Sequence, residues 1–304
     1  MYQPRRASRS TSVPIRGWSY HLRSWGEPSA QRAPLVLVHG WMDVAASWQF
    51  VVDALQADRH IVAPDWRGFG LTTTTAPPTD SYWFPDYIAD LDALLDEVAG
   101  EHAVDLVGHS MGGNVATLYA GVRPQRVRRL VNLEGFGLPA SSPAQAPGRY
   151  AQWLDETRAL RRGETELKTY DSPDGVARRL MKTNPRLPQD KADWLARQWA
   201  QPDAQGRWAI LGDPAHKVTS ATLYRVEEAL AIYRRITAPT LSVTASGDSL
   251  AQWWKGRFSL AEYRERIAQI PQVQEAVIQE AGHMMHHDQP EALAQLVEDF
   301  LAGD

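Results

Sequence analysis

The chain has 304 residues and a formal net charge of −4 at pH 7, with 32 basic and 36 acidic side chains. This balance gives no electrostatic footprint for nucleic acid or an anionic membrane. The chain contains no cysteine, which excludes disulfides and thiol catalysis. No apolar run approaches the roughly 18 residues of a membrane span, and no secretory signal is apparent. We therefore expect a cytoplasmic protein with one large α/β domain.

The first third of the chain alternates between predicted strands and helices. Residues 1–15 are basic and polar and are expected to form a flexible arm. Trp18–Trp25 alternates in polarity, which predicts a strand of an opening antiparallel pair. Pro34–His39 and His60–Pro64 are continuous apolar runs, typical of strands buried on both faces of a parallel sheet. Apolar residues at helical spacing over Tyr87–Val98 predict a helix.

The remaining chain predicts an insertion within this pattern. Residues 137–235 are charged and helical in period, and we expect them to form a helical cap between two parts of one core, residues 1–136 and 236–304. The core elements expected on either side of the cap are strands at Val127–Leu133, Thr240–Ser246 and Val273–Gln279 and a helix at Pro290–Leu301. Because strands and helices alternate, the sheet should be mostly parallel.

Val104–Tyr119 carries the strongest chemical signal. An apolar strand is followed by Gly108-His109-Ser110-Met111-Gly112 and then by a helical pattern. Strand, Gly-x-Ser-x-Gly turn and helix together describe a nucleophile elbow. The turn strains Ser110, and the two glycines allow strand and helix to approach closely. Ser110 is the predicted nucleophile, and a hydroxyl needs a neighbouring base.

Five sequence motifs, in their order along the chain, resemble those of the α/β-hydrolase fold. Their residues are most similar to those of the serine hydrolase-like proteins. The motifs lie at His39–Asp43, Asp65–Gly70, Gly108–Gly112, Ala238–Asp248 and Ala281–Glu291. The resemblance implies a mostly parallel sheet with helices on its flanks and a helical cap inserted after the sixth strand. Dehalogenases and epoxide hydrolases of this fold attack with an aspartate at the elbow, so Ser110 disfavours both activities.

The resemblance places the catalytic base at His283, on the loop after the last strand. Serine, acid and histidine then follow in the fold's usual order. His286 and His287 compete for the role, but a partly exposed helix start is expected there. His109 adjoins the nucleophile, where packing or local hydrogen bonding is expected rather than proton transfer.

Two carboxylates are candidates for the acid that orients the imidazole. Asp248 follows the strand Thr240–Ser246, where most relatives keep this group, and it is the first choice. Glu134 ends the strand Val127–Leu133, where one subgroup of dehalogenases and some serine hydrolases place theirs. Both positions lie at carboxyl ends of strands, where ligands gather in such sheets.

The resemblance assigns the oxyanion hole to the backbone amides of Trp41 and Met111, which would stabilise the developing negative charge. Several aromatic residues fall in or near the cap. Together with His109, the side chains of Trp153, Trp253 and Trp254 are expected to line the substrate pocket.

These features predict a serine hydrolase that cleaves an ester-type bond of a small to medium hydrophobic substrate. No cofactor is required, and no ligand spacing in the His283–His287 run predicts a metal site. The alternatives are hydrolysis of a lactone, thioester, amide or C–C bond, or a non-catalytic ligand-binding protein on the same fold.

Overall fold

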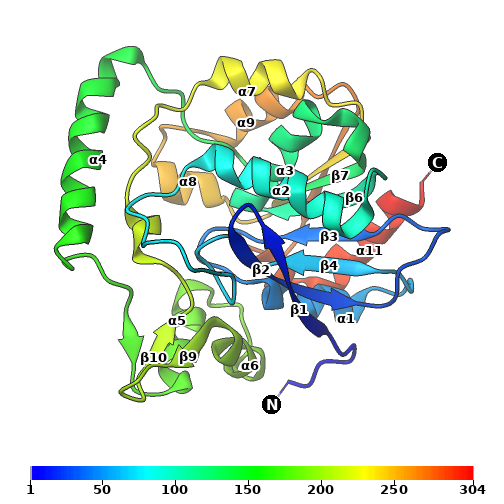
Figure 1. Cartoon of the computed structure of the whole chain (residues 1–304). Coiled ribbons are helices and arrows are strands. Elements are labelled where there is room, and N and C mark those ends of the chain that lie inside the picture. Colours follow the sequence, from blue (N-terminus) through cyan, green and yellow to red (C-terminus); the bar gives the residue numbers. More distant parts are fainter. Residues whose placement is uncertain (1, 304) are drawn as a thin grey trace.

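The computed structural model describes residues 2–303. Its centre is a sheet with strand order β1-β2-β4-β3-β6-β7-β11-β12, with the short β5 paired to β2 (Figure 1). The strands are β1 (Arg9–Ile15), β2 (Trp18–Trp25), β3 (Leu35–Val38), β4 (Ile61–Pro64), β5 (Thr73–Thr74), β6 (Val104–His109), β7 (Val127–Leu133), β11 (Thr240–Ala245) and β12 (Val273–Ile278). From β4 to β12 all neighbours are parallel, which confirms the predicted mostly parallel sheet.

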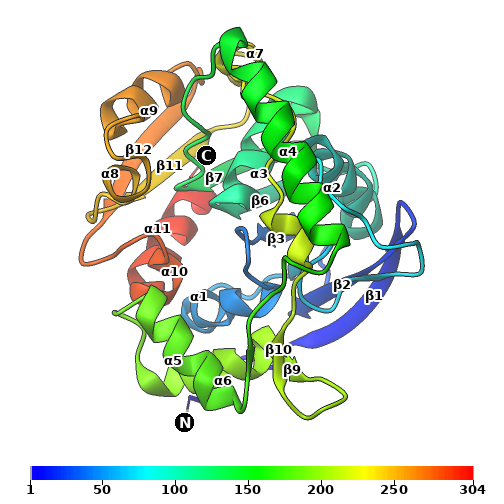
Figure 2. The same ribbon diagram turned by 90° about the vertical axis from the view of Figure 1, so that its left-hand side faces the viewer.

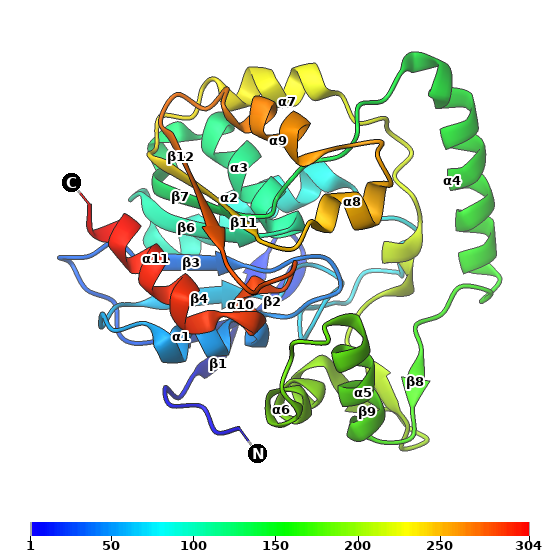
Figure 3. The same ribbon diagram turned by 180° about the vertical axis from the view of Figure 1, so that it is seen from behind.

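Helices cover both faces of the sheet (Figure 3). One face carries α1 (Gln49–Ala54), α10 (Met285–Asp288) and α11 (Pro290–Ala302); the other carries α2 (Phe84–Ala99), α3 (Met111–Val122), α7 (Val226–Tyr233) and α9 (Leu260–Ile267). The core also includes α8 (Ser249–Trp254) and two short 3-10 helices, η1 (Ala45–Trp48) and η2 (Pro124–Arg126). The central parallel strands β3, β4 and β6 are buried on both sides, which explains their continuous apolar sequences, whereas the edge strand β12 is largely exposed.

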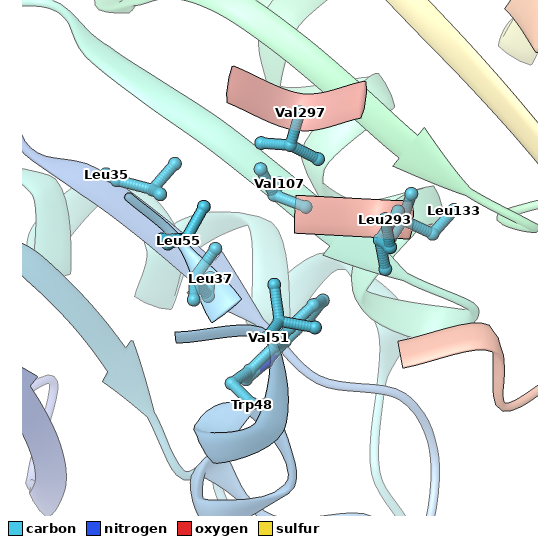
Figure 4. Close-up of a pocket in the computed structure, with 9 residues that line it drawn as sticks. All are labelled: Leu35, Leu37, Trp48, Val51, Leu55, Val107, Leu133, Leu293 and Val297. Atoms are coloured by element: carbon cyan, nitrogen blue, oxygen red, sulfur yellow. The ribbon is translucent and has the colours of Figure 1, made fainter. Parts of the chain in front are cut away.

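The layer between the sheet and the α1 and α11 helices is closely packed. Figure 4 shows leucine and valine side chains from β3, β6 and β7 facing those of α1 and α11, with Trp48 at one end. The void among these side chains measures only about 10 Å³. A void of this size holds at most one water molecule, so this layer serves as core and not as a ligand site.

The N-terminal segment differs from the expected flexible arm. Strand β1 pairs antiparallel with β2 along its whole length, from Arg9 opposite Ser24 to Ile15 opposite Trp18. Before this strand, the backbone amide of Arg6 donates to Asp53 at 2.9 Å. The polar composition reflects an exposed edge strand, since five of the first six residues of β1 are exposed.

The cap contains strands as well as the predicted helices. It comprises η3 (Pro143–Gln145), α4 (Ala146–Arg161), β8 (Thr169–Tyr170), α5 (Pro173–Thr183), α6 (Gln189–Trp199), β9 (Ala200–Pro202), β10 (Trp208–Ile210) and η4 (Pro214–Lys217). The three short strands form their own sheet. Figure 2 shows α4 in front of the core, joined at its lower end by a loop to the part of the cap that contains α5 and α6. Helix α7 falls within the expected cap range but packs on α3 and contributes to the core.

A stacked histidine joins the cap to the core. The His216 ring lies between those of Phe69 and Tyr82, with centroid distances of 3.8 Å on each side. Burial lowers the pKa of His216 to about 3 from its ordinary value of 6.5. Between pH 6.5 and pH 3, His216 is therefore neutral in the folded chain and protonated in the unfolded chain.

We expect acidification to loosen this contact. Below pH 6.5 the unfolded chain binds the additional proton, so the free energy of unfolding should fall as the pH drops toward 3, by at most about 1.4 kcal/mol per pH unit. His216→Phe keeps the stacking and removes the titration, so denaturant unfolding across this range should show a shallower slope. The exposed His102→Gln serves as the control, and an unchanged slope in His216→Phe would contradict the prediction.

Among residues 2–303, no helix combines the length and apolarity needed to cross a membrane.

Candidate active site

The predicted elbow has the backbone geometry of a strained turn. Strand β6 ends at His109, helix α3 begins at Met111, and Ser110 between them has φ 54° and ψ −116°. A Cβ added to Gly108 would lie 2.4 Å from the Gly112 carbonyl oxygen. One added to Gly112 would lie 2.4 Å from the carbonyl oxygen of Val38. Helix α3 can approach β6 and β3 this closely only with glycine at these two positions.

His283 is paired with a buried carboxylate. Its Nδ1 lies 2.7 Å from Oε2 of Glu134, whose side chain is 1% exposed. The second oxygen, Oε1, accepts a hydrogen bond from the Ala245 amide at 2.9 Å. Glu134 itself has φ 50°, a left-handed conformation uncommon for this residue type, at the end of β7. This pairing fixes the imidazole tautomer with the proton on Nδ1 and the lone pair on Nε2.

The first-choice acid, Asp248, does not contact His283 in the structure. Its exposed side chain caps helix α8, accepting a hydrogen bond from the Ala251 amide at 2.9 Å. The chain turns into α8 soon after β11, and the free amides of the helix start hold the carboxylate there. The assignment of Asp248 as the partner of His283 is therefore corrected to Glu134.

Two polar residues that the sequence did not single out hold the loops of this pair. Asn132, two residues before Glu134, accepts from the Gly135 amide at 2.6 Å and donates to the Gly135 carbonyl at 3.1 Å. Asp288 accepts from the Gly282 amide at 2.8 Å and from Asn184 of the cap at 2.7 Å. For Asn132, the sequence did offer a signal: an asparagine shortly before a carboxylate at the end of a predicted strand.

The other histidines near the site are buried and differ from His283. His109 Nε2–H donates to the His283 carbonyl oxygen at 2.8 Å. Burial, followed by the nearby His286, holds the pKa of His109 well below its ordinary value, so the ring is neutral. His286 packs on Trp48 and His287 on Phe50, both rings almost fully buried. The expected partly exposed helix start is therefore wrong for these two.

Two backbone amides lie beside Ser110 without an acceptor. Among the hydrogen bonds of residues 2–303, neither the Trp41 nor the Met111 amide donates to a protein group. The loop that carries Trp41 adjoins the serine, because a Cβ on Gly40 would lie 3.0 Å from Ser110 Cβ. The Trp41 side chain points outward, 51% exposed, with Nε1 3.3 Å from the His216 carbonyl oxygen. Free amides at these positions suit a developing oxyanion.

A cavity of about 410 Å³ lies one helical turn beyond the serine. Asn114, whose amide donates to the Ser110 carbonyl at 3.0 Å, is part of its wall. Its apolar lining includes Phe84, Leu118, Leu138, Tyr224 and Trp254.

The four residues expected to line the pocket occupy different places. Trp254 lines the cavity. Trp253 instead packs edge-on against the His283 ring at 4.2 Å, and Trp153 faces Trp83 at 6.5 Å. His109 is buried beneath the elbow and is no part of the cavity wall. Of the four, Trp254 lines this cavity, and a role of the other three in substrate binding stays a prediction.

Comparisons with known proteins agree with this architecture. The alpha/beta hydrolase fold family matches residues 33–290. A serine hydrolase-like protein of Danio rerio is 26% identical over 98% of this chain and 89% of its own length. A 2-hydroxy-6-oxo-2,4-heptadienoate hydrolase of Pseudomonas putida is 38% identical, but over only 34% of this chain and 38% of its own. The thioesterase domain from the curacin biosynthetic pathway superposes with a TM-score of 0.79 at 23% identity, over 96% of this chain and 99% of that domain. The chain belongs to the alpha/beta hydrolase family.

Proposed function

We propose that this protein is a serine hydrolase that cleaves an ester-type bond through an acyl-enzyme. The observation that carries the proposal is the buried His283–Glu134 pair, at 2.7 Å, on loops beside the strained Ser110 turn. A hydroxyl becomes nucleophilic when an oriented base accepts its proton. Sequence relatives that are hydrolases support the assignment to this class of enzyme.

The reaction follows from these groups. Ser110 Oγ attacks the substrate carbonyl carbon while its proton passes to Nε2 of His283. Glu134 stabilises the resulting imidazolium, and the amides of Trp41 and Met111 donate to the tetrahedral oxyanion. The carbon–oxygen bond to the leaving group then breaks, and Nε2 returns the proton to the departing alcohol. A water molecule attacks the acyl group by the same sequence, which releases the acid and restores the serine hydroxyl.

The cavity supports a medium-sized, mainly apolar substrate. Its volume of about 410 Å³ falls within the range of roughly 300 to 1,000 Å³ typical of small-molecule sites. Aromatic and aliphatic side chains such as Leu118, Tyr224 and Trp254 offer apolar area for an acyl or alcohol chain. Arg149 and Arg257 also border it, which leaves room for a polar end on the substrate.

A second candidate is hydrolysis of a C–C bond beside a ketone. It is favoured by the match to the 2-hydroxy-6-oxo-2,4-heptadienoate hydrolase over about a third of this chain. The same nucleophile and oxyanion hole would serve that reaction, with a carbanion in place of the alkoxide as the leaving group.

Turnover of a panel of p-nitrophenyl esters, from acetate to decanoate, tests the proposal. We expect hydrolysis with an optimum at intermediate chain length, and an acyl adduct on the chain in rapidly quenched samples analysed by mass. Leu118→Trp narrows the cavity and should shift the optimum to shorter acyl chains, whereas Leu154→Ala on the exposed side of α4 should not. Absence of turnover on esters, together with cleavage of a vinylogous diketone, would favour the C–C reaction. Tight ligand binding without any turnover would favour a binding protein.

A further inference from the structure

Three buried side chains meet close to the elbow. Asp43 follows the Trp41 loop, His109 ends β6, and His286 lies in α10. The three are 3%, 2% and 1% exposed, and their potential ligand atoms all lie within 4.8 Å of one another. Three segments far apart in the chain therefore converge on one point.

Each of these side chains has a buried polar atom without a partner. Asp43 Oδ1 accepts from the Val44 amide at 2.8 Å and from the Ser47 hydroxyl, while Oδ2 has no hydrogen bond. His286 Nε2 forms a buried ion-pair contact with that Oδ2 at 3.5 Å but also has no hydrogen bond. This separation is long for a hydrogen bond. It is close to the roughly 3.4 Å between two ligands of a tetrahedral metal ion, since each bond is about 2.1 Å long.

The tautomer of His109 leaves its lone pair facing the same cluster. Because Nε2–H donates to the His283 carbonyl at 2.8 Å, Nδ1 carries the lone pair, and no protein group binds it among residues 2–303. An imidazole whose other nitrogen donates to a backbone carbonyl is the usual arrangement of a metal-ligating histidine. A Cβ on Gly40 would lie 3.1 Å from this Nδ1, so glycine leaves the nitrogen uncovered.

We propose that Asp43, His109 and His286 form a binding site for a divalent transition-metal cation of the Zn²⁺ or Co²⁺ type. Two imidazole nitrogens and one carboxylate oxygen match the ligand preference of these ions, with a water molecule in the fourth position. Unpartnered buried polar atoms are costly. A shared cation would bind Asp43 Oδ2, His109 Nδ1 and one of the two ring nitrogens of His286, none of which has a hydrogen bond. This set takes His286 from the His283–His287 run, in which no metal site was expected, and combines it with ligands from two distant segments.

The site would connect three segments of the active site. Asp43 lies two residues after Trp41, and His109 lies next to Ser110 and donates to the main chain of His283. A bound cation would thus hold the oxyanion loop, the elbow and the base loop in one arrangement without contacting the substrate. Its effect is on positioning and stability and does not depend on the proposed reaction.

Titration of the metal-free 304-residue chain with Co²⁺ and Zn²⁺ tests the site. We expect one cation per chain, visible absorption bands of tetrahedral Co²⁺, and a higher thermal unfolding midpoint with Zn²⁺. Asp43→Asn keeps the Oδ1 contacts and removes the ligand charge, and His286→Gln removes an imidazole. Each should weaken binding by at least about 100-fold, because even the loss of a supporting hydrogen bond to a ligand costs up to that factor.

His287→Gln is the matched control, because His287 is equally buried beside the cluster but outside it. His283→Gln distinguishes binding at the catalytic imidazole, and both variants should retain the cation. Anomalous diffraction from a Zn²⁺-loaded crystal of the unaltered chain locates the ion even if the ligand variants fail to fold. Failure of the unaltered chain to bind one cation, an ion located elsewhere, or binding that survives Asp43→Asn and His286→Gln would overturn the proposal.

Discussion

Replacing Glu134 by Gln is expected to lower kcat on the best ester substrate by about 10⁴-fold. The carboxylate accepts the Nδ1 proton of His283 at 2.7 Å, whereas an amide can donate to Nδ1 and stabilise the opposite tautomer. The imidazolium formed during attack would also lose its only buried counter-charge at this distance among the described residues. Steady-state kinetics at saturating substrate measure the effect, and circular dichroism checks that the variant is folded.

Asp248→Asn is the matched control for that change. This exposed carboxylate caps α8, and asparagine also caps helices well, so kcat should stay within about twofold and stability should change little. A large loss in Asp248→Asn with little loss in Glu134→Gln would mean that the loop after β11 moves to bring its aspartate to His283. Comparable losses from both would exclude a single acid.

Replacing Ser110 by Ala is expected to lower kcat by about 10⁶-fold, since removal of the nucleophile of a serine hydrolase costs approximately that factor. The substitution removes one oxygen and leaves the amides of Trp41 and Met111 in place, so a substrate analogue should bind with similar affinity. Hydrolysis followed over hours measures the residual rate, and Ser12→Ala on the exposed strand β1 is the control. A residual rate within tenfold of the unaltered chain would assign the chemistry to another group.

Much of the fold was predictable because buried parallel strands have a distinctive sequence. Val127–Leu133 was predicted as a strand and is β7 with the same bounds, since its apolar side chains are buried on both faces. The elbow was equally clear, because the close contact of α3 with β6 requires glycine at Gly108 and its close contact with β3 requires glycine at Gly112. Local patterns of this kind depend on neighbours in the sequence, and the sequence displays them directly.

The sequence alone could not identify which carboxylate pairs with His283. Glu134 and Asp248 follow adjacent parallel strands, with Leu133 in register with Val243, so both reach the same edge of the sheet. Which carboxylate faces His283 depends on the path of each loop, and the left-handed turn at Glu134 and the early start of α8 decide it. The choice between the two carboxylates depends on the three-dimensional path of the loops, and not on residue type.

Clusters of side chains from distant segments also could not be predicted from the sequence. Asp43, His109 and His286 belong to three motifs that were interpreted separately, and only folding brings them within 4.8 Å. The N-terminal strand was missed for a related reason: an exposed edge strand has few apolar residues, so its composition is that of a loop. In both cases the missing information was which segment lies beside which.

The most direct test of the account is intact-mass detection of fluorophosphonate labelling on the unaltered chain and on Ser110→Ala. The account predicts one adduct per unaltered chain and none on the alanine variant, because only a serine activated by His283 and Glu134 reacts at an appreciable rate. An adduct on both would place the reactive residue elsewhere. No adduct on either would contradict an activated Ser110 and favour the ligand-binding alternative.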